Sequence, residues 1–120
     1  MQAEYVFRVR FRLDAQRVRT EPEQFEAVVR LTAATPGDDG WLFFRNALWR
    51  GEVNDRSYAR ELAGGWLGVP IESIDFLEFE CDEEYRRALS EEIERNLGTF
   101  NATSVSEAIT KYFGSSIRVR

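Results

Sequence analysis

Apolar and polar residues alternate along four short stretches of the chain, which is the pattern of half-buried β-strands. The stretches cover 5–13, 25–33, 73–81 and 116–120. In the first, the apolar residues at odd positions, Leu13 included, face one side and three arginines face the other. Four strands with one apolar face each are therefore predicted.

The third stretch assigns its side chains to two faces. Leu77, Phe79 and Cys81 are predicted to lie on the inward face, and Glu78 and Glu80 on the outward face. Strict alternation places acidic side chains on the same outward side as the arginines of the other strands.

Helical spacing of apolar residues predicts three helices, over 54–67, 82–97 and 104–114. Asp82 and Ser104 are suited to begin the last two helices, because short oxygen-bearing side chains accept hydrogen bonds from free N–H groups there. Asn54 or Asp55 can cap the first helix in the same way.

The stretch 41–50 is open to two interpretations. As a strand it would extend a hairpin. As a helix it would begin after Asp38 or Asp39 and end before Gly51, with Arg50 in its last turn. Its length and these boundary residues favour the helix.

The predicted order is therefore β-β-α-α-β-α-α-β. This order indicates an α+β fold with a single four-stranded, mainly antiparallel sheet and helices packed on one face. The 120 residues are expected to form one domain, 1–120, with one hydrophobic core. The order of the strands within the sheet does not follow from the sequence.

Charge adds information about the environment. The chain has 21 acidic and 16 basic residues, net −5, and Lys111 is its one lysine beside 15 arginines. The first 60 residues carry a net charge of +1 and the last 60 a net charge of −6. An acidic, lysine-poor composition suggests a protein that stays soluble in high salt, although a GC-rich genome alone would also favour arginine over lysine.

Several classes of chemistry are excluded by composition. With no histidine and only Cys81, the chain can form neither an internal disulfide, nor a Cys/His zinc site, nor a catalytic triad with histidine. Cys81 is expected to be a buried, unreactive thiol. No apolar run is long enough to span a membrane and the first residues do not resemble a signal peptide, so we expect a cytoplasmic protein without membrane contact. We expect no cofactor.

Aromatic residues are concentrated just before the "RGE" segment. Trp41, Phe44, Trp49 and Arg50 form a candidate interface, because tryptophan and arginine are enriched at protein contacts. The favoured interpretation is that the aromatic residues form a core helix, and that this helix can serve as an interface in addition.

A polar cluster follows at Glu52, Asn54 and Asp55. Glu52 and Asp55 could bind Mg²⁺ or Ca²⁺, with Arg50 holding an anionic substrate. The favoured interpretation is structural, with Gly51 ending one helix and Asn54 or Asp55 beginning the next.

A second candidate surface is the outward face of the sheet. It would bring together Arg8, Arg10, Arg12, Arg30, Arg118 and Arg120, a set that could bind nucleic acid or another polyanion. Only Val6 and Phe76 are predicted among them, so bases would have no stacking platform. The favoured interpretation pairs these arginines with Glu26, Glu78 and Glu80 across the strands.

Two segments, "LFFRNALWRGEVND" and the terminal "KYFGSSIRVR", resemble the LWR-salt family, whose name refers to the segment that is here Leu48, Trp49 and Arg50. The resemblance runs over nearly the whole chain. It implies the cytoplasm of a halophilic archaeon with molar potassium chloride. It implies no activity, cofactor or catalytic residue, since no function is assigned to the family.

We therefore expect a non-enzymatic module that self-associates or binds a protein partner. The alternatives are a nucleic-acid or polyanion binder that uses the arginine face and, with least support, a carboxylate-metal enzyme at Glu52 and Asp55.

Overall fold

The structure, a computed structural model, describes residues 1–12 and 24–120, so the inward position predicted for Leu13 lies outside the described residues. Its elements are β1 (Ala3–Arg12), β2 (Gln24–Thr32), α1 (Phe43–Ala47), β3 (Leu48–Trp49), β4 (Glu52–Val53), α2 (Arg56–Leu67), β5 (Ile71–Cys81), α3 (Glu83–Arg95), the 3₁₀ helix η1 (Leu97–Phe100), α4 (Val105–Phe113) and β6 (Ile117–Val119). The predicted order is confirmed, with the two short strands β3 and β4 and the helix η1 added to it.

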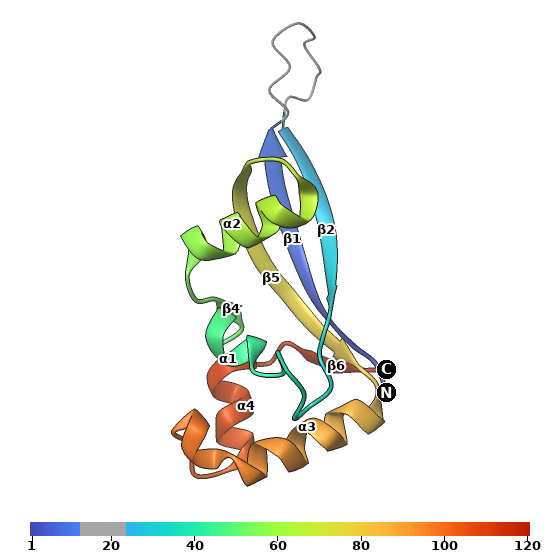
Figure 1. Ribbon diagram of the computed structural model, residues 1–120, viewed down its shortest axis with the longest axis vertical. Coiled ribbons are helices and arrows are strands. Elements are labelled where there is room, and N and C mark those ends of the chain that lie inside the picture. The colour runs from blue at the N-terminus through green and yellow to red at the C-terminus, as the bar shows by residue number, and fades with distance from the viewer. Residues whose placement is uncertain (13–23) are drawn as a thin grey trace, which may run out of the picture.

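One sheet has the strand order β2-β1-β5-β6. β1 runs antiparallel to both β2 and β5, and β6 runs parallel to β5. Helix α2 lies across one end of the sheet, and α3 and α4 lie at the other end, where the chain termini also meet (Figure 1). The predicted α+β fold with a mainly antiparallel four-stranded sheet is confirmed.

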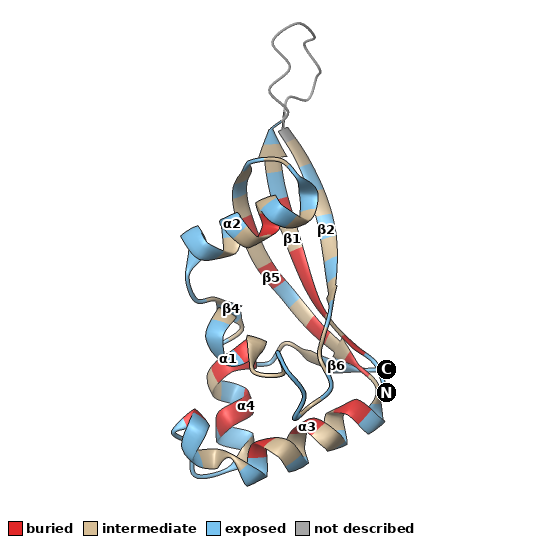
Figure 2. Cartoon of the chain, in the orientation of Figure 1, coloured by how far each residue is buried: buried red, intermediate tan, exposed pale blue. Residues whose placement is uncertain are grey.

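The core lies between the sheet and the helices and is rich in aromatic rings. Phe44, Phe79, Phe100 and Phe113 are among the largest fully buried side chains. Buried positions follow the inward faces of β1, β5, α3 and α4 (Figure 2). Burying one such side chain contributes roughly 1.5–3 kcal/mol relative to leaving it exposed, so these rings account for much of the stability of the fold.

A bulge in β5 reverses part of the predicted alternation. Phe7 faces Phe76, and Val6 faces Glu78, so Leu77 is left without a partner in β1. Phe76 is 8% exposed and belongs to the core, whereas Leu77 is 39% exposed. The predicted faces of Phe76 and Leu77 are wrong because an unpaired residue in a strand reverses the side-chain alternation beside it.

The helix predicted over 41–50 is wrong at its start and in its second half. It begins at Phe43, after Leu42, which makes no capping hydrogen bond, and not after Asp38 or Asp39. Helix α1 ends at Ala47, and the chain then forms the hairpin of β3 and β4. Arg50 and Gly51 are the two turn residues, with φ angles of 52° and 81°. Positive φ at both positions is what a two-residue type I′ turn requires, and it ends any helix.

The other helices begin where the capping residues predict. Asp55, Asp82 and Ser104 each accept a hydrogen bond from the backbone N–H three residues later, at 3.1, 2.8 and 3.1 Å. These bonds satisfy donors that the first turn of a helix leaves free.

Candidate functional site

The turn between β3 and β4 donates hydrogen bonds to the C-terminal end of helix α4. The backbone N–H of Arg50 donates to the carbonyl of Lys111, and the N–H of Gly51 donates to the carbonyl of Tyr112, both at 2.8 Å. These carbonyls belong to the last turn of α4, where intrahelical partners are missing. The turn is therefore fixed to the helix by two backbone hydrogen bonds.

Two glycines allow this close approach. A Cβ atom on Gly51 would lie 2.8 Å from the carbonyl oxygen of Phe113, and one on Gly114 would lie 2.9 Å from the carbonyl oxygen of Arg50. Both glycines also have positive φ. No other residue fits either position without displacing backbone.

An exposed indole stands on this turn. Trp49 is 43% exposed, and one edge of its ring contacts Tyr112, with the ring centroids 6.1 Å apart. The guanidinium carbon of Arg50 lies 5.6 Å from the centroid of the indole, and the Nζ atom of Lys111 lies 5.9 Å from it. Both separations are within the range of cation–π contacts.

Trp49 and Arg50 border an open groove along α4, with a volume of about 780 Å³. Glu107, Thr110 and Lys111 line its helix side. We call this surface the Trp49 corner: the turn residues Trp49 and Arg50 together with these three residues of α4. Its openness suits an extended partner surface better than a small ligand, which a pocket would enclose on most sides.

The four residues of the predicted interface separate into two groups. Trp49 and Arg50 lie together at the exposed corner. Phe44 is 1% exposed and stacks with Phe113 at 4.8 Å between centroids. Trp41 is half-buried, and an edge of its ring contacts Phe100 at 5.9 Å. Trp49 and Arg50 are exposed to solvent, whereas Phe44 is part of the core.

The polar cluster has structural contacts. The carboxylate of Asp55 caps α2, and the backbone N–H of Asn54 donates to the carbonyl of Ala47 at 2.8 Å. Glu52 is exposed in β4 opposite Trp49. Within residues 1–12 and 24–120, no group of three or more acidic or cysteine side chains is arranged to hold a metal ion.

The six arginines of the predicted polyanion face all have carboxylate neighbours. The ion pairs are Arg8–Asp75 (3.3 Å), Arg10–Glu26 (3.2 Å), Arg12–Glu72 (2.6 Å), Arg30–Glu80 (2.6 Å), Arg30–Glu4 (3.5 Å), Arg118–Glu78 (3.9 Å), Arg120–Glu78 (3.5 Å) and Arg120–Glu80. The predicted pairing with Glu26, Glu78 and Glu80 is confirmed. Sequence reasoning missed Glu4, Glu72 and Asp75, which complete the set.

Electrostatics on this face centre on Arg30 and Glu80. The hydrogen bond from Arg30, aided by the charge of Arg120, lowers the pKa of the Glu80 carboxyl below its ordinary value. The same contact raises the pKa of Arg30.

Val6, whose neighbours in register are Arg30 and Glu78, is only 3% exposed although it lies on the outward side.

The buried titratable groups are poor candidates for nucleophiles. Burial raises the pKa of the Cys81 thiol and raises the pKa of Tyr85 to about 12. The hydroxyl of Tyr85 donates to the carbonyl of Ala34 at 2.6 Å. Cys81 is 4% exposed, which confirms that it is buried as predicted. Protonated, buried thiols react slowly, because the thiolate is the reactive form.

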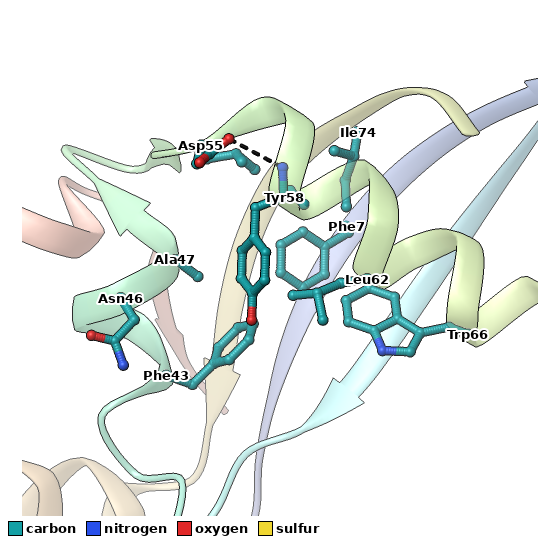
Figure 3. A pocket seen from close by; sticks show the side chains of 11 residues that line it. Phe7, Phe43, Asn46, Ala47, Asp55, Tyr58, Leu62, Trp66 and Ile74 are labelled. Carbon is teal, nitrogen blue, oxygen red and sulfur yellow. Dashed lines mark hydrogen bonds between the residues drawn. The ribbon is translucent and has the colours of Figure 1, made fainter. Parts of the chain in front are cut away.

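A small apolar cavity lies between α2 and the sheet (Figure 3). Its volume of about 20 Å³ is far below the roughly 300 Å³ at which ligand pockets begin. Its lining includes Phe7, Phe43, Tyr58, Leu62, Trp66 and Ile74. The cavity is a packing gap with room for about one water molecule.

The two segments that meet at the corner, 48–51 and 111–114, lie within the two segments that carry the family resemblance. A family model described as "LWR-salt protein" matches residues 1–120. The chain belongs to the LWR-salt protein family. Neither a curated protein nor a solved structure matches it at a significant level. In the described part of the chain, no helix is both long and apolar enough to cross a bilayer.

The structure assigns a separate task to each residue of the LWR segment. Leu48 is completely buried and anchors the hairpin in the core. Trp49 is presented to solvent beside α4. Arg50 takes the left-handed turn position and places its guanidinium over the indole.

Proposed function

We propose that this LWR-salt protein is a non-enzymatic interaction module of a halophile's cytoplasm, and that it binds a protein partner through the Trp49 corner. One observation carries the proposal. Trp49 keeps 43% of its surface exposed on a turn that two backbone hydrogen bonds join to α4 and that approaches α4 closely at Gly51 and Gly114. Rigid, partly exposed tryptophan and arginine side chains are the residues that most often dominate protein-binding energy.

The backbone of Arg50 supports the same proposal. A non-glycine residue with a φ of 52° is uncommon, and Asn, Asp or Gly usually fills this position of a type I′ turn. An arginine here costs stability of the order of 1 kcal/mol. Such a cost is tolerated at functional sites, where the side chain serves a purpose other than folding.

The chemistry of the corner indicates the kind of partner. Two cations flank the indole, and Arg50 extends into solvent. A protein segment with an acidic side chain next to an apolar one would pair with the guanidinium and cover the ring. In molar salt the Debye length is about 3 Å, so the apolar contact supplies most of the affinity and the ion pair adds selectivity.

The alternative functions have weaker support. A polyanion on the sheet face would first have to displace the carboxylates that neighbour all six arginines. A metal at Glu52 and Asp55 would compete with the capping bond of Asp55 at 3.1 Å.

The proposal is tested by capturing a partner from the source cytoplasm in about 2 M KCl, identifying it, and measuring its binding to the purified protein by calorimetry. We expect Trp49→Ala and Arg50→Ala each to weaken binding about tenfold or more, the effect of losing 1.4 kcal/mol. Tyr58→Ala is the matched control, because Tyr58 is an aromatic residue, 51% exposed, on α2 outside the corner.

Equal binding by the wild type and Trp49→Ala would overturn the proposal. So would binding of a single-stranded oligonucleotide, at low or high salt, that both corner substitutions abolish, since the corner would then be a nucleic-acid site.

A further inference from the structure

Among the residues that the structure describes, no strand pairs with the outer edge of β2. The strand β2 is nine residues long, pairs with β1 on one side, and ends the strand order of the sheet (Figure 1). Its ladder with β1 has no register shift. Long, regular edge strands are templates for pairing with another chain unless charge, proline or a bulge blocks them.

The hydrogen-bonding phase of β2 shows which groups the free edge offers. The N–H of Ala33, the residue after β2, donates to the carbonyl of Ala3 at 2.9 Å. This bond continues the β1–β2 register, in which Thr32 faces Glu4, so odd-numbered residues direct their backbone groups toward β1. Even-numbered residues direct theirs away from β1. The N–H and C=O groups of Glu26, Val28 and Arg30 therefore point to the free edge.

From this edge we infer that a second copy of the chain pairs antiparallel with β2, with Val28 opposite Val28 of the second copy on a two-fold axis. Val28 is the middle residue of Gln24–Thr32, so this register pairs the whole strand. It aligns the outward-pointing backbone groups of both copies and allows about ten backbone hydrogen bonds.

Side-chain chemistry specifies the register. Glu26 and Arg30 are equidistant from Val28, so each would face the opposite charge on the second copy. On the inner face, half-buried Phe25 would face Leu31 of the other copy, and Ala27 would face Val29. A two-fold axis at residue 26 or 30 would instead oppose like charges, which destabilises a strand pair.

Val28 itself also supports a second copy as the occupant. It is 58% exposed, the largest exposure among the large hydrophobic residues of the described chain. In the paired strands the side chain of Val28 would pack against Val28 of the second copy. A strand whose charges read Glu-x-Val-x-Arg complements itself only when antiparallel, which favours self-association over an unrelated strand.

The test combines light scattering with proline substitutions at about 100 µM protein in 2 M KCl, where charge-driven contacts are screened. The wild type is expected to be a dimer and Val28→Pro a monomer with unchanged circular dichroism, because the N–H of Val28 bonds nothing in β1. Val119→Pro is the matched control. Val119 is exposed on the other edge strand, and its N–H points away from β5, because the neighbouring Arg120 N–H donates to Cys81.

Cysteine cross-linking tests the register independently of folding effects. Under mild oxidation Val28→Cys is expected to form a covalent dimer, because facing residues lie about 5.5 Å apart between Cα atoms. Thr32→Cys, which would face residue 24, is expected to stay unlinked. The native Cys81 is buried and does not compete.

A monomeric wild type, a dimer that survives Val28→Pro, or the absence of a Val28→Cys cross-link would each overturn this inference. A dimer that Trp49→Ala dissociates would overturn it too, while leaving the proposed role of the Trp49 corner intact.

Discussion

At Gly51 and Gly114 single backbone positions decide whether the Trp49 corner can form. We predict that Gly51→Ala and Gly114→Ala each lower the free energy of unfolding by about 2 kcal/mol or more. Both sites combine positive φ with a backbone oxygen less than 3 Å from the added Cβ. Denaturant unfolding measures the effect.

Gly65 provides the control for these substitutions. It lies in α2, and apart from the backbone of its own helix nothing lies within 4 Å of an added Cβ. Gly65→Ala should raise stability by up to about 1 kcal/mol, because alanine is the better helix residue. Equal effects at all three glycines would show that the corner does not need its close approach.

Arg50 separates stability from binding at the level of one side chain. We predict that the free energy of unfolding of Arg50→Asn equals that of the wild type or exceeds it by up to about 1 kcal/mol, because asparagine tolerates the left-handed turn. The same substitution should weaken partner binding, because the guanidinium over Trp49 is lost.

Arg50→Ala distinguishes the two effects. Both variants lose the cation–π contact, but only alanine keeps the strain at φ 52°, so Arg50→Ala should be less stable than Arg50→Asn. Thermal unfolding of the three proteins gives the comparison, and a stability order with Arg50→Asn lowest would contradict it.

Among the elements, β5 and its neighbours are held by an ion-pair network with a definite pH dependence. The folded protein lowers the pKa of Glu80, so it binds fewer protons there than the unfolded chain. This contribution is complete above about pH 4.3, the ordinary pKa of glutamate, and is lost as the pH falls through the folded value. Stability from this site therefore decreases on acidification.

We predict that Arg30→Gln raises the pKa of Glu80, measured by NMR titration of its carboxyl carbon, because Arg30 is the largest cause of the lowering. The difference in stability between this variant and the wild type should be greatest near neutral pH and shrink below about pH 4. Arg95→Gln, which removes the Arg95–Glu92 pair on α3, should leave the Glu80 pKa unchanged.

Elements with a clear period could be predicted from the sequence, and those defined by distant contacts could not. Alternation predicted β1 and β2, and cap residues such as Asp82 and Ser104 predicted where helices begin. The bulge at Leu77 has no local signal, because it exists only relative to β1. The turn at Arg50 lacks the asparagine that usually marks a type I′ turn, so the sequence did not predict it. The turn is recognised only from its hydrogen bonds to α4.

The candidate surfaces were likewise predicted only in part from the sequence. The six arginines were found from alternation, and so were three of their carboxylate partners. Glu72 was missed because β5 begins at Ile71, two residues before the predicted strand. The exposure of Trp49 depends on the hairpin, which no periodicity reveals.

At the scale of the whole molecule, the two proposed contact surfaces do not compete. β2 borders one side of the molecule, whereas β4 and α4 lie on the other side (Figure 1). A dimer that pairs through β2 would keep both helix layers on one face of a continuous sheet and leave two Trp49 corners free. Two equal sites on one particle increase avidity for a partner that is itself multivalent.

The distribution of charge leads to a prediction for the whole molecule in salt. The sheet face is balanced by contact pairs, so the net charge of −5 resides elsewhere, with an acidic surplus on α3. Repulsion over longer distances is screened when the Debye length falls to about 3 Å at 1 M, whereas contact pairs lose less. The melting temperature should therefore rise between about 0.1 and 2 M KCl.

The charges that cause this rise can be removed selectively. Glu91 and Glu94 are exposed on α3, and replacing both with glutamine reduces the net charge without touching the sheet face. The double variant should show a smaller rise of melting temperature with KCl. Replacing Arg8 with glutamine and Asp75 with asparagine removes one contact pair at constant net charge and outside β2, and should leave the slope unchanged. A melting temperature that falls with salt in the wild type would mean that the contact pairs on the sheet, and not the net charge, control the response.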